Sequence, residues 1–85
     1  MRFQLSRHAR EEMERRAIPM ALLEGVLQAP QQIGPECGGK KAYQSQMQFS
    51  GKMFLLRAIV ADDIDPAIVV TVYRISKISK YWTIP

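Results

Sequence analysis

His8 is the single histidine of this 85-residue chain, and imidazole is the side chain that most readily exchanges a proton near neutral pH. It stands two residues after Ser6, in the first turn of a predicted helix, where the helix dipole disfavours the protonated form. A neutral imidazole there could act as a general base or acid. The alternative is a solvated or capping histidine with no chemical role.

A second set of polar groups lies on two predicted strands. Arg57 interrupts the apolar run 53–61, and Thr71 and Tyr73 alternate with apolar residues in the β-branched run 67–75. If the apolar sides of both strands face the helices, these three side chains emerge together on an open sheet face that suits a phosphate. The alternative is an arginine that snorkels from a sheet edge and a tyrosine that fills the core.

Basic and aromatic residues alternate near the C-terminus, over 74–82. Lys77 and Lys80 could neutralise phosphates while Tyr81 stacks on a base, so we expect these three residues to bind RNA. The same alternation is equally typical of core anchors that stand beside lysines on a soluble sheet edge.

Metal and cofactor sites have little support in the sequence. One histidine and one cysteine, Cys37, cannot supply the usual zinc ligands, and a lone cysteine forms no internal disulfide. Asp62, Asp63 and Asp65 crowd a turn before Pro66, which is typical of a solvated turn rather than a magnesium site. We therefore expect no metal and no cofactor.

Two helices are predicted to begin the chain. Ser6 is a good N-cap for a helix that continues to about Arg16. Pro19 suits the first position of a second helix, which Pro30 ends. Each helix carries one apolar stripe, so both must pack against another layer.

The remainder of the chain is predicted to form a sheet. Residues 43–49 alternate in the manner of a strand with one wet face, Ser50 and Gly51 mark a hairpin, and 53–61 and 67–75 are buried strands. Short strands at 31–33 and 81–83 are also expected. The predicted fold is α+β, with two N-terminal helices packed on one face of an antiparallel meander of three to four strands.

Length and charge limit the function classes. Eighty-five residues make one small domain, 1–85, which is too short for a doubly wound nucleotide-binding sheet. The net charge of +4 favours an anionic partner. No apolar run approaches the roughly 20 residues that span a bilayer, and the start lacks the apolar core of a signal peptide. We expect a cytoplasmic protein with no membrane association.

Two motifs resemble a known family. The opening Phe3-x-Leu5-Ser6-x-His8-Ala9, with Met13 and Arg16-Ala17-Ile18 after it, and the strand 68–73 resemble the family named domain of unknown function forty-two fifty-eight. The sequence departs from that pattern at Ala17 and Pro19, where members more often have Gly and Ser or Thr.

The resemblance implies a function. In layout that family is similar to the RelE-like and BrnT-like toxins, which implies a metal-independent endoribonuclease that forms a 2′,3′-cyclic phosphate and has an antitoxin-like protein partner. The catalytic residues would be His8 as base or acid, Arg57 as phosphate stabiliser, and Thr71 and Tyr73 as orienting groups. The alternative is a non-catalytic module that binds RNA or protein and self-associates as a homodimer.

Overall fold

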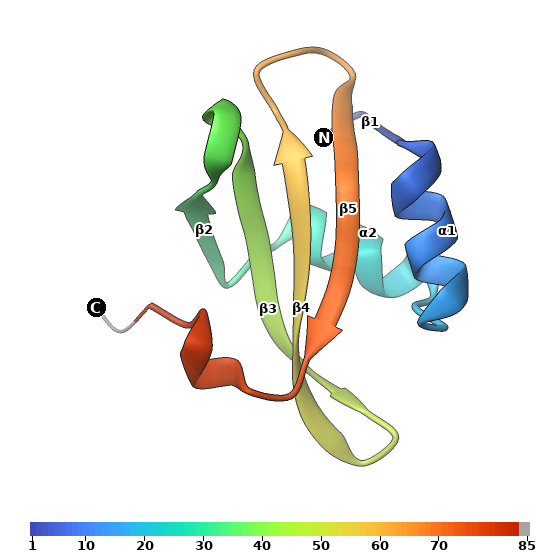
Figure 1. The fold of residues 1–85 in the computed structure, drawn as a ribbon, viewed down its shortest axis with the longest axis vertical. Coiled ribbons are helices and arrows are strands. Elements are labelled where there is room, and N and C mark those ends of the chain that lie inside the picture. Colours follow the sequence, from blue (N-terminus) through green and yellow to red (C-terminus); the bar gives the residue numbers. More distant parts are fainter. Residues whose placement is uncertain (84–85) are drawn as a thin grey trace.

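The computed structural model describes residues 1–83. Figure 1 shows a twisted sheet with two helices on one side of it. The elements in chain order are β1 (Phe3–Leu5), α1 (Arg7–Arg15), α2 (Met20–Gln28), β2 (Gln32–Pro35), the 3₁₀ turn η1 (Cys37–Gly39), β3 (Lys41–Phe49), β4 (Lys52–Ala61), β5 (Ala67–Ile75) and the 3₁₀ turn η2 (Ile78–Lys80).

The sheet has five strands in the order β1-β5-β4-β3-β2. Strands β2 to β5 form the predicted antiparallel meander, whereas β1 pairs with the start of β5 in parallel, Phe3 opposite Ala67. The prediction of three to four purely antiparallel strands is therefore wrong in number and in direction at one edge. Three residues are too few to show a strand periodicity, so no pattern in the sequence indicates β1.

Both helices pack on one face of the sheet, as predicted. Ala9 and Met13 of α1 join a buried cluster with Leu23, Val26 and Leu27 of α2 and with the strand residues Tyr43, Leu56, Ala58, Val60, Ala67, Val69 and Val72. Ser6 is the N-cap of α1, its Oγ accepting a hydrogen bond from the Ala9 amide at 3.0 Å. Pro19 is the N-cap of α2 and not its first residue, so α2 begins at Met20, one residue later than predicted.

A bulge changes which residues of β5 face the helices. The register passes from Ile59 opposite Thr71 to Val60 opposite Val69, so Val70 has no partner on β4. Val69 consequently faces the helix-side core, although regular alternation along 67–75 predicts that it shares a face with Thr71 and Tyr73. A bulge adds one residue to one strand and reverses the alternation beyond it.

The other sheet face is covered over its middle, contrary to prediction. Residues 76–83, here named the C-terminal strap, leave the end of β5 and run across β3 towards β2 (Figure 1). Gln44 is buried, but Gln46 is half-buried and Gln48 is exposed on the same face, so the predicted wet face of β3 is covered only at one end. The strap contains η2 and, within the described residues, no strand at 81–83.

The described part of the chain has no helix long and apolar enough to cross a membrane.

Candidate nucleic-acid interface

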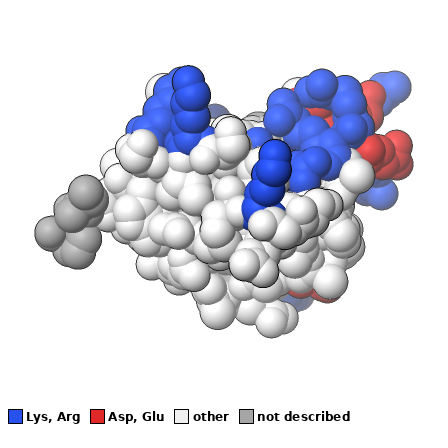
Figure 2. Space-filling view, turned by 90° about the horizontal axis from the view of Figure 1, so that it is seen from below, with Lys and Arg blue, Asp and Glu red and all other residues white. Residues whose placement is uncertain are grey.

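A basic groove of about 630 Å³ lies where the end of α1, the end of β5 and the strap meet. We define the basic groove by its five cationic side chains and one ring: Arg15, Arg16, Arg74, Lys77, Lys80 and Tyr81. Figure 2 views the molecule from below and shows basic side chains gathered along one rim, with most acidic atoms at one side of it. Such a concentration of cations is suited to a phosphodiester backbone.

Acidic neighbours neutralise part of this charge. Glu12 lies 2.7 Å from the Arg15 guanidinium and 3.6 Å from that of Arg16. The hydrogen bond from Arg15 lowers the pKa of Glu12, so this carboxylate keeps its charge and holds both arginines. Among residues 1–83, Arg74, Lys77 and Lys80 form no ion pair. These three side chains are therefore the cations of the groove that no carboxylate neutralises.

Aromatic rings position the third arginine of the groove. The Arg74 guanidinium stacks 4.1 Å from the centroid of Phe49 and 5.2 Å from that of Phe54. The two rings meet edge to face across the β3–β4 hairpin. A guanidinium held flat on rings keeps its N–H edges free for an anion.

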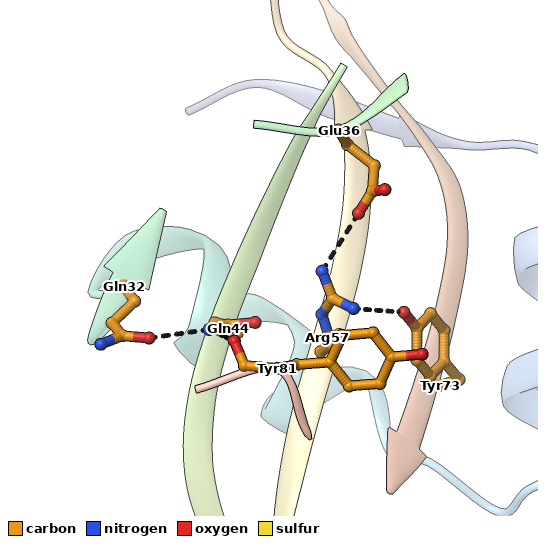
Figure 3. A network of polar contacts seen from close by, with 6 residues as sticks. All are labelled: Gln32, Glu36, Gln44, Arg57, Tyr73 and Tyr81. Atoms are coloured by element: carbon orange, nitrogen blue, oxygen red, sulfur yellow. Dashed lines mark hydrogen bonds and ion pairs between the residues drawn. The ribbon is translucent and has the colours of Figure 1, made fainter. Parts of the chain in front are cut away.

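Beside the groove, Arg57 is the centre of a buried polar cluster on the sheet face opposite the helices (Figure 3). Arg57 is only 6% exposed. Its Nη1 donates to the Tyr73 hydroxyl at 2.8 Å, and its Nη2 donates to a Glu36 carboxylate oxygen at 3.1 Å. The Tyr81 ring lies over the guanidinium, 4.1 Å from Cζ to centroid. We call Glu36, Gln44, Arg57, Tyr73 and Tyr81 the Arg57 cluster.

The sequence builds this cluster from five separate segments. Arg57 and Tyr73 are directly opposite each other on β4 and β5, and Gln44 is directly opposite Arg57 on β3. Glu36 arrives from the turn between β2 and η1, and Tyr81 from the strap. Cross-strand neighbours on one face are about 5 Å apart, so the pairing register alone brings the three strand residues together.

Burial and the nearby positive charge change the pKa of Tyr73 in opposite directions. Burial raises the pKa of the Tyr73 phenol, and the neighbouring Arg57 guanidinium opposes part of that rise. The phenol therefore keeps its proton at neutral pH, so its oxygen can accept from Arg57 while its proton is available to another acceptor.

Two polar atoms of the cluster lack a partner within residues 1–83. They are Nε of Arg57, which is a donor, and Oε1 of Gln44, which is an acceptor. Gln44 uses its other end, because its Nε2 donates to Gln32 Oε1 at 2.8 Å and to the Tyr81 carbonyl at 3.1 Å. Unsatisfied atoms of this kind are rare in protein interiors, and a bound anion could accept a hydrogen bond from Arg57 Nε.

The structure brings together some of the predicted site residues and separates others. Arg57 and Tyr73 are in contact, but they do not emerge on an open face, because the strap and Glu36 cover Arg57. Thr71 points to the same face two residues before Tyr73 but lies opposite Ile59, and no hydrogen bond joins its side chain to the cluster among the described residues. Lys77, Lys80 and Tyr81 all line the basic groove.

His8 lies apart from both sites. It is exposed on α1, the helix that packs on the sheet face opposite to Arg57. Eight residues separate it from Arg16 at the groove, which corresponds to about 12 Å along a helix axis. Within one chain, the folded protein does not combine His8 with Arg57 and Tyr73.

Several site residues were missed by sequence reasoning. Glu36 and Gln44 carry no motif and reach Arg57 only through the fold. Arg15, Arg16 and Arg74 were visible as basic residues at the ends of a helix and a strand, but only tertiary packing brings these ends together. Among residues 1–83, no three His, Cys, Asp or Glu side chains are grouped to hold a metal ion.

Comparison with known proteins gives one result on family. The model of the family described as "Domain of unknown function (DUF4258)" matches residues 5–74. No curated protein and no solved structure matches the chain. The matched range begins in β1 and ends in β5, so it includes both helices and Arg57 and stops before the strap. The chain belongs to the DUF4258 family, a domain family of unknown function.

Proposed function

We propose that this protein binds single-stranded RNA in the basic groove and cleaves it as a metal-independent, toxin-like endoribonuclease. The observation that supports this most is the position of Tyr81, which lines the groove and also stacks on Arg57 at 4.1 Å. A strand held by Lys77 and Lys80 would therefore run beside a carboxylate, a guanidinium and a phenol. Those three groups can serve as the general base, the charge stabiliser and the general acid of phosphodiester cleavage without a metal.

The proposed reaction is attack by a ribose 2′-hydroxyl on the adjacent phosphorus. The new O–P bond closes a 2′,3′-cyclic phosphate, and the bond from phosphorus to the 5′-oxygen breaks. Glu36 accepts the proton of the 2′-hydroxyl, Tyr73 donates its proton to the leaving 5′-oxygen, and Arg57 stabilises the charge on the phosphoryl oxygens. The phenol is restored by a proton from Glu36, so protons balance over one turnover. Thr71 would orient the substrate beside Tyr73.

A labelled oligoribonucleotide tests this proposal. Wild-type protein in EDTA should give fragments that end in a cyclic phosphate, and Glu36→Gln and Tyr73→Phe should each lower the rate at least 100-fold, on the order of what general acid–base catalysis contributes. His8→Ala separates the proposed centre from a histidine mechanism: its rate should stay within about twofold of wild type. Intact RNA after incubation with folded wild-type protein would rule out the enzyme.

A non-catalytic RNA-binding module is the second candidate. It is favoured by the burial of Arg57, which is 6% exposed beneath the Tyr81 ring. The same assay distinguishes the two, because a binding module shifts the anisotropy of the oligonucleotide and leaves its length unchanged. Binding that weakens as salt rises would support it.

A toxin-like nuclease also implies an inhibitor. We infer an antitoxin-like protein whose acidic surface covers the basic groove in the cytoplasm, by charge complementarity. Growth arrest on expression of the chain alone, relieved by Glu36→Gln, would support this setting. A homodimer through an edge strand, β1 or β2, is the alternative for self-association, and sedimentation at several protein concentrations tests it.

A further inference from the structure

We propose that the C-terminal strap is a movable cover, and that an RNA phosphodiester reaches Arg57 only after Tyr81 leaves the guanidinium. The inference rests on the proposed RNA binding and adds a second, hidden phosphate contact to it. In the closed form Arg57 is 6% exposed, and Tyr81 lies over it at 4.1 Å. Binding to the groove and access to Arg57 are thereby linked through one residue.

Two polar atoms under the strap have no hydrogen-bond partner among the described residues. Nε of Arg57 and Oε1 of Gln44 are buried without a partner within residues 1–83, on side chains directly opposite each other in the β3–β4 register. A buried donor or acceptor without a hydrogen bond destabilises the closed form. Opening would hydrate both atoms, and a phosphate oxygen could then accept from Arg57 Nε.

The strap is attached in a way that permits it to move as a unit. Its own backbone hydrogen bonds are local, from Ile78, Lys80, Tyr81 and Trp82 to carbonyls within the strap. Among the described residues, hydrogen bonds from the rest of the chain come from two glutamines. Gln44 donates to the Tyr81 carbonyl, and Gln32 both donates to and accepts from the backbone of Thr83. No strand ladder holds the strap to the sheet.

RNA bound in the groove should shift the strap towards its open form. Lys77, Lys80 and Tyr81 belong to the strap and line the groove, so a strand bound there contacts the moving part directly. A base that stacks on Tyr81 would replace the stacking of this ring on Arg57. A ligand shifts an equilibrium by its differential affinity for the two forms, and here the open form offers the additional contact with Arg57.

Gln32→Ala tests the proposal, because it removes both bonds to Thr83 without changing a groove residue. It also removes the bond that Gln32 accepts from Gln44, whose Nε2 keeps its bond to the Tyr81 carbonyl. Gln31→Ala is the matched control, since the Gln31 side chain accepts from the Gln46 backbone amide and, among the described residues, forms no hydrogen bond with the strap. Gln32→Ala should raise hydrogen exchange over 76–83 and tighten RNA binding several-fold. The gain would be about tenfold if the strap is closed nine-tenths of the time. Gln31→Ala should change neither quantity.

The added contact with Arg57 has its own readout. In an Arg57→Gln background, Gln32→Ala should no longer tighten RNA binding. The salt dependence of RNA binding by the Gln32→Ala variant gives a second measurement. It can be made even if the Arg57→Gln variant does not fold. The slope of log K against log salt for Gln32→Ala should be steeper than that of wild type by up to about 0.7, the value for one phosphate contact with a single strand, because RNA bound to wild type with the strap closed lacks the contact with Arg57.

The outcomes are distinguishable. Faster exchange in the strap with unchanged RNA affinity and salt slope would show that the strap does not control access, and would overturn this inference while RNA binding stands. Absence of RNA binding by wild type and by every folded variant would overturn the proposed function and this inference together.

Discussion

Arg57 donates a 2.8 Å hydrogen bond to the Tyr73 hydroxyl from the directly opposite position on the neighbouring strand. With Glu36 at 3.1 Å and Tyr81 stacked above, the guanidinium joins β4 and β5 to the turn before η1 and to the strap. One side chain thus connects four segments that are distant in sequence. Its removal should therefore be measurable as a loss of stability as well as of function.

Arg57→Met tests that connection. The substitution leaves the Tyr73 hydroxyl and Glu36 without their donor, but the Glu36 side chain is 32% exposed and can hydrate. We therefore expect the free energy of unfolding in urea to fall by about 1–3 kcal/mol, less than for a fully buried pair. Arg2→Met is the control, because the Arg2–Asp65 pair is 75% and 78% exposed and should contribute less than about 0.5 kcal/mol. Equal effects would contradict the connecting role of Arg57.

A second polar pair should make stability depend on pH. The Tyr43 hydroxyl donates to Asp62 at 2.7 Å, and this bond, helped by Lys41, lowers the pKa of Asp62. A carboxyl whose pKa is lowered by folding stabilises the folded state above its unfolded pKa of about 3.9. That stability is lost as the pH falls through the folded pKa. Burial and Asp62 raise the pKa of Tyr43 to about 12, so the phenol keeps its proton throughout this range.

Urea unfolding between pH 7 and pH 2 measures the effect of that pair. Tyr43→Phe should destabilise the protein at pH 7 and reduce the loss of stability on acidification, because the Asp62 pKa moves back towards its ordinary value. Asp63→Asn is the neighbouring control. A Tyr43→Phe variant whose stability falls with acid as steeply as that of wild type would contradict the assignment.

The turn between the helices carries backbone strain. Ala17 has φ +53°, a left-handed conformation that glycine adopts without steric cost and other residues do not. This is the position at which the sequence has Ala and the related pattern more often has Gly. Ala17→Gly should raise the free energy of unfolding by about 1 kcal/mol. Ala21→Gly, at an exposed position inside α2, should lower it by a similar amount, so opposite signs are expected from the same chemical change.

Local signals predicted most of the fold. Ser6 marked the start of α1, Ser50 and Gly51 marked the hairpin, and the apolar face of β4 marked the side on which the helices pack. These features depend on neighbours in sequence, which is why one chain was enough to identify them. The bulge at Val70 and the parallel strand β1 depend on pairing between distant segments, and neither leaves a pattern in the sequence.

Some residues of the candidate site could likewise be predicted from local sequence patterns, and others could not. Alternation on one strand identified Arg57, and alternation on the next identified Tyr73, but their contact required the register of two strands. Glu36 and Gln44 are ordinary polar residues in sequence and became part of the site only through the fold. The open sheet face was wrongly predicted, because nothing in 76–83 signals that this segment crosses the sheet instead of extending it.

RNA binding in the basic groove should depend on salt concentration in a way that identifies the lysines involved. If Lys80 contacts an RNA phosphate, Lys80→Ala should weaken binding of a single-stranded oligonucleotide and lower the slope of log K against log salt by about 0.7, because one fewer cation is released on binding. Lys77→Ala should behave in the same way. Fluorescence anisotropy between 50 and 300 mM salt, on the order of the range in which such slopes are resolved, measures this.

Lys40→Ala is the matched control for the salt experiment. It removes the same charge from the end of η1, and Lys40 does not line the groove. A lysine outside the groove acts only through screened, long-range attraction, which fades beyond about 10 Å at 0.1 M salt. Its removal should therefore weaken binding slightly and leave the slope unchanged. Equal slopes for Lys80→Ala, Lys77→Ala and Lys40→Ala would mean that net charge, rather than the groove, attracts the RNA.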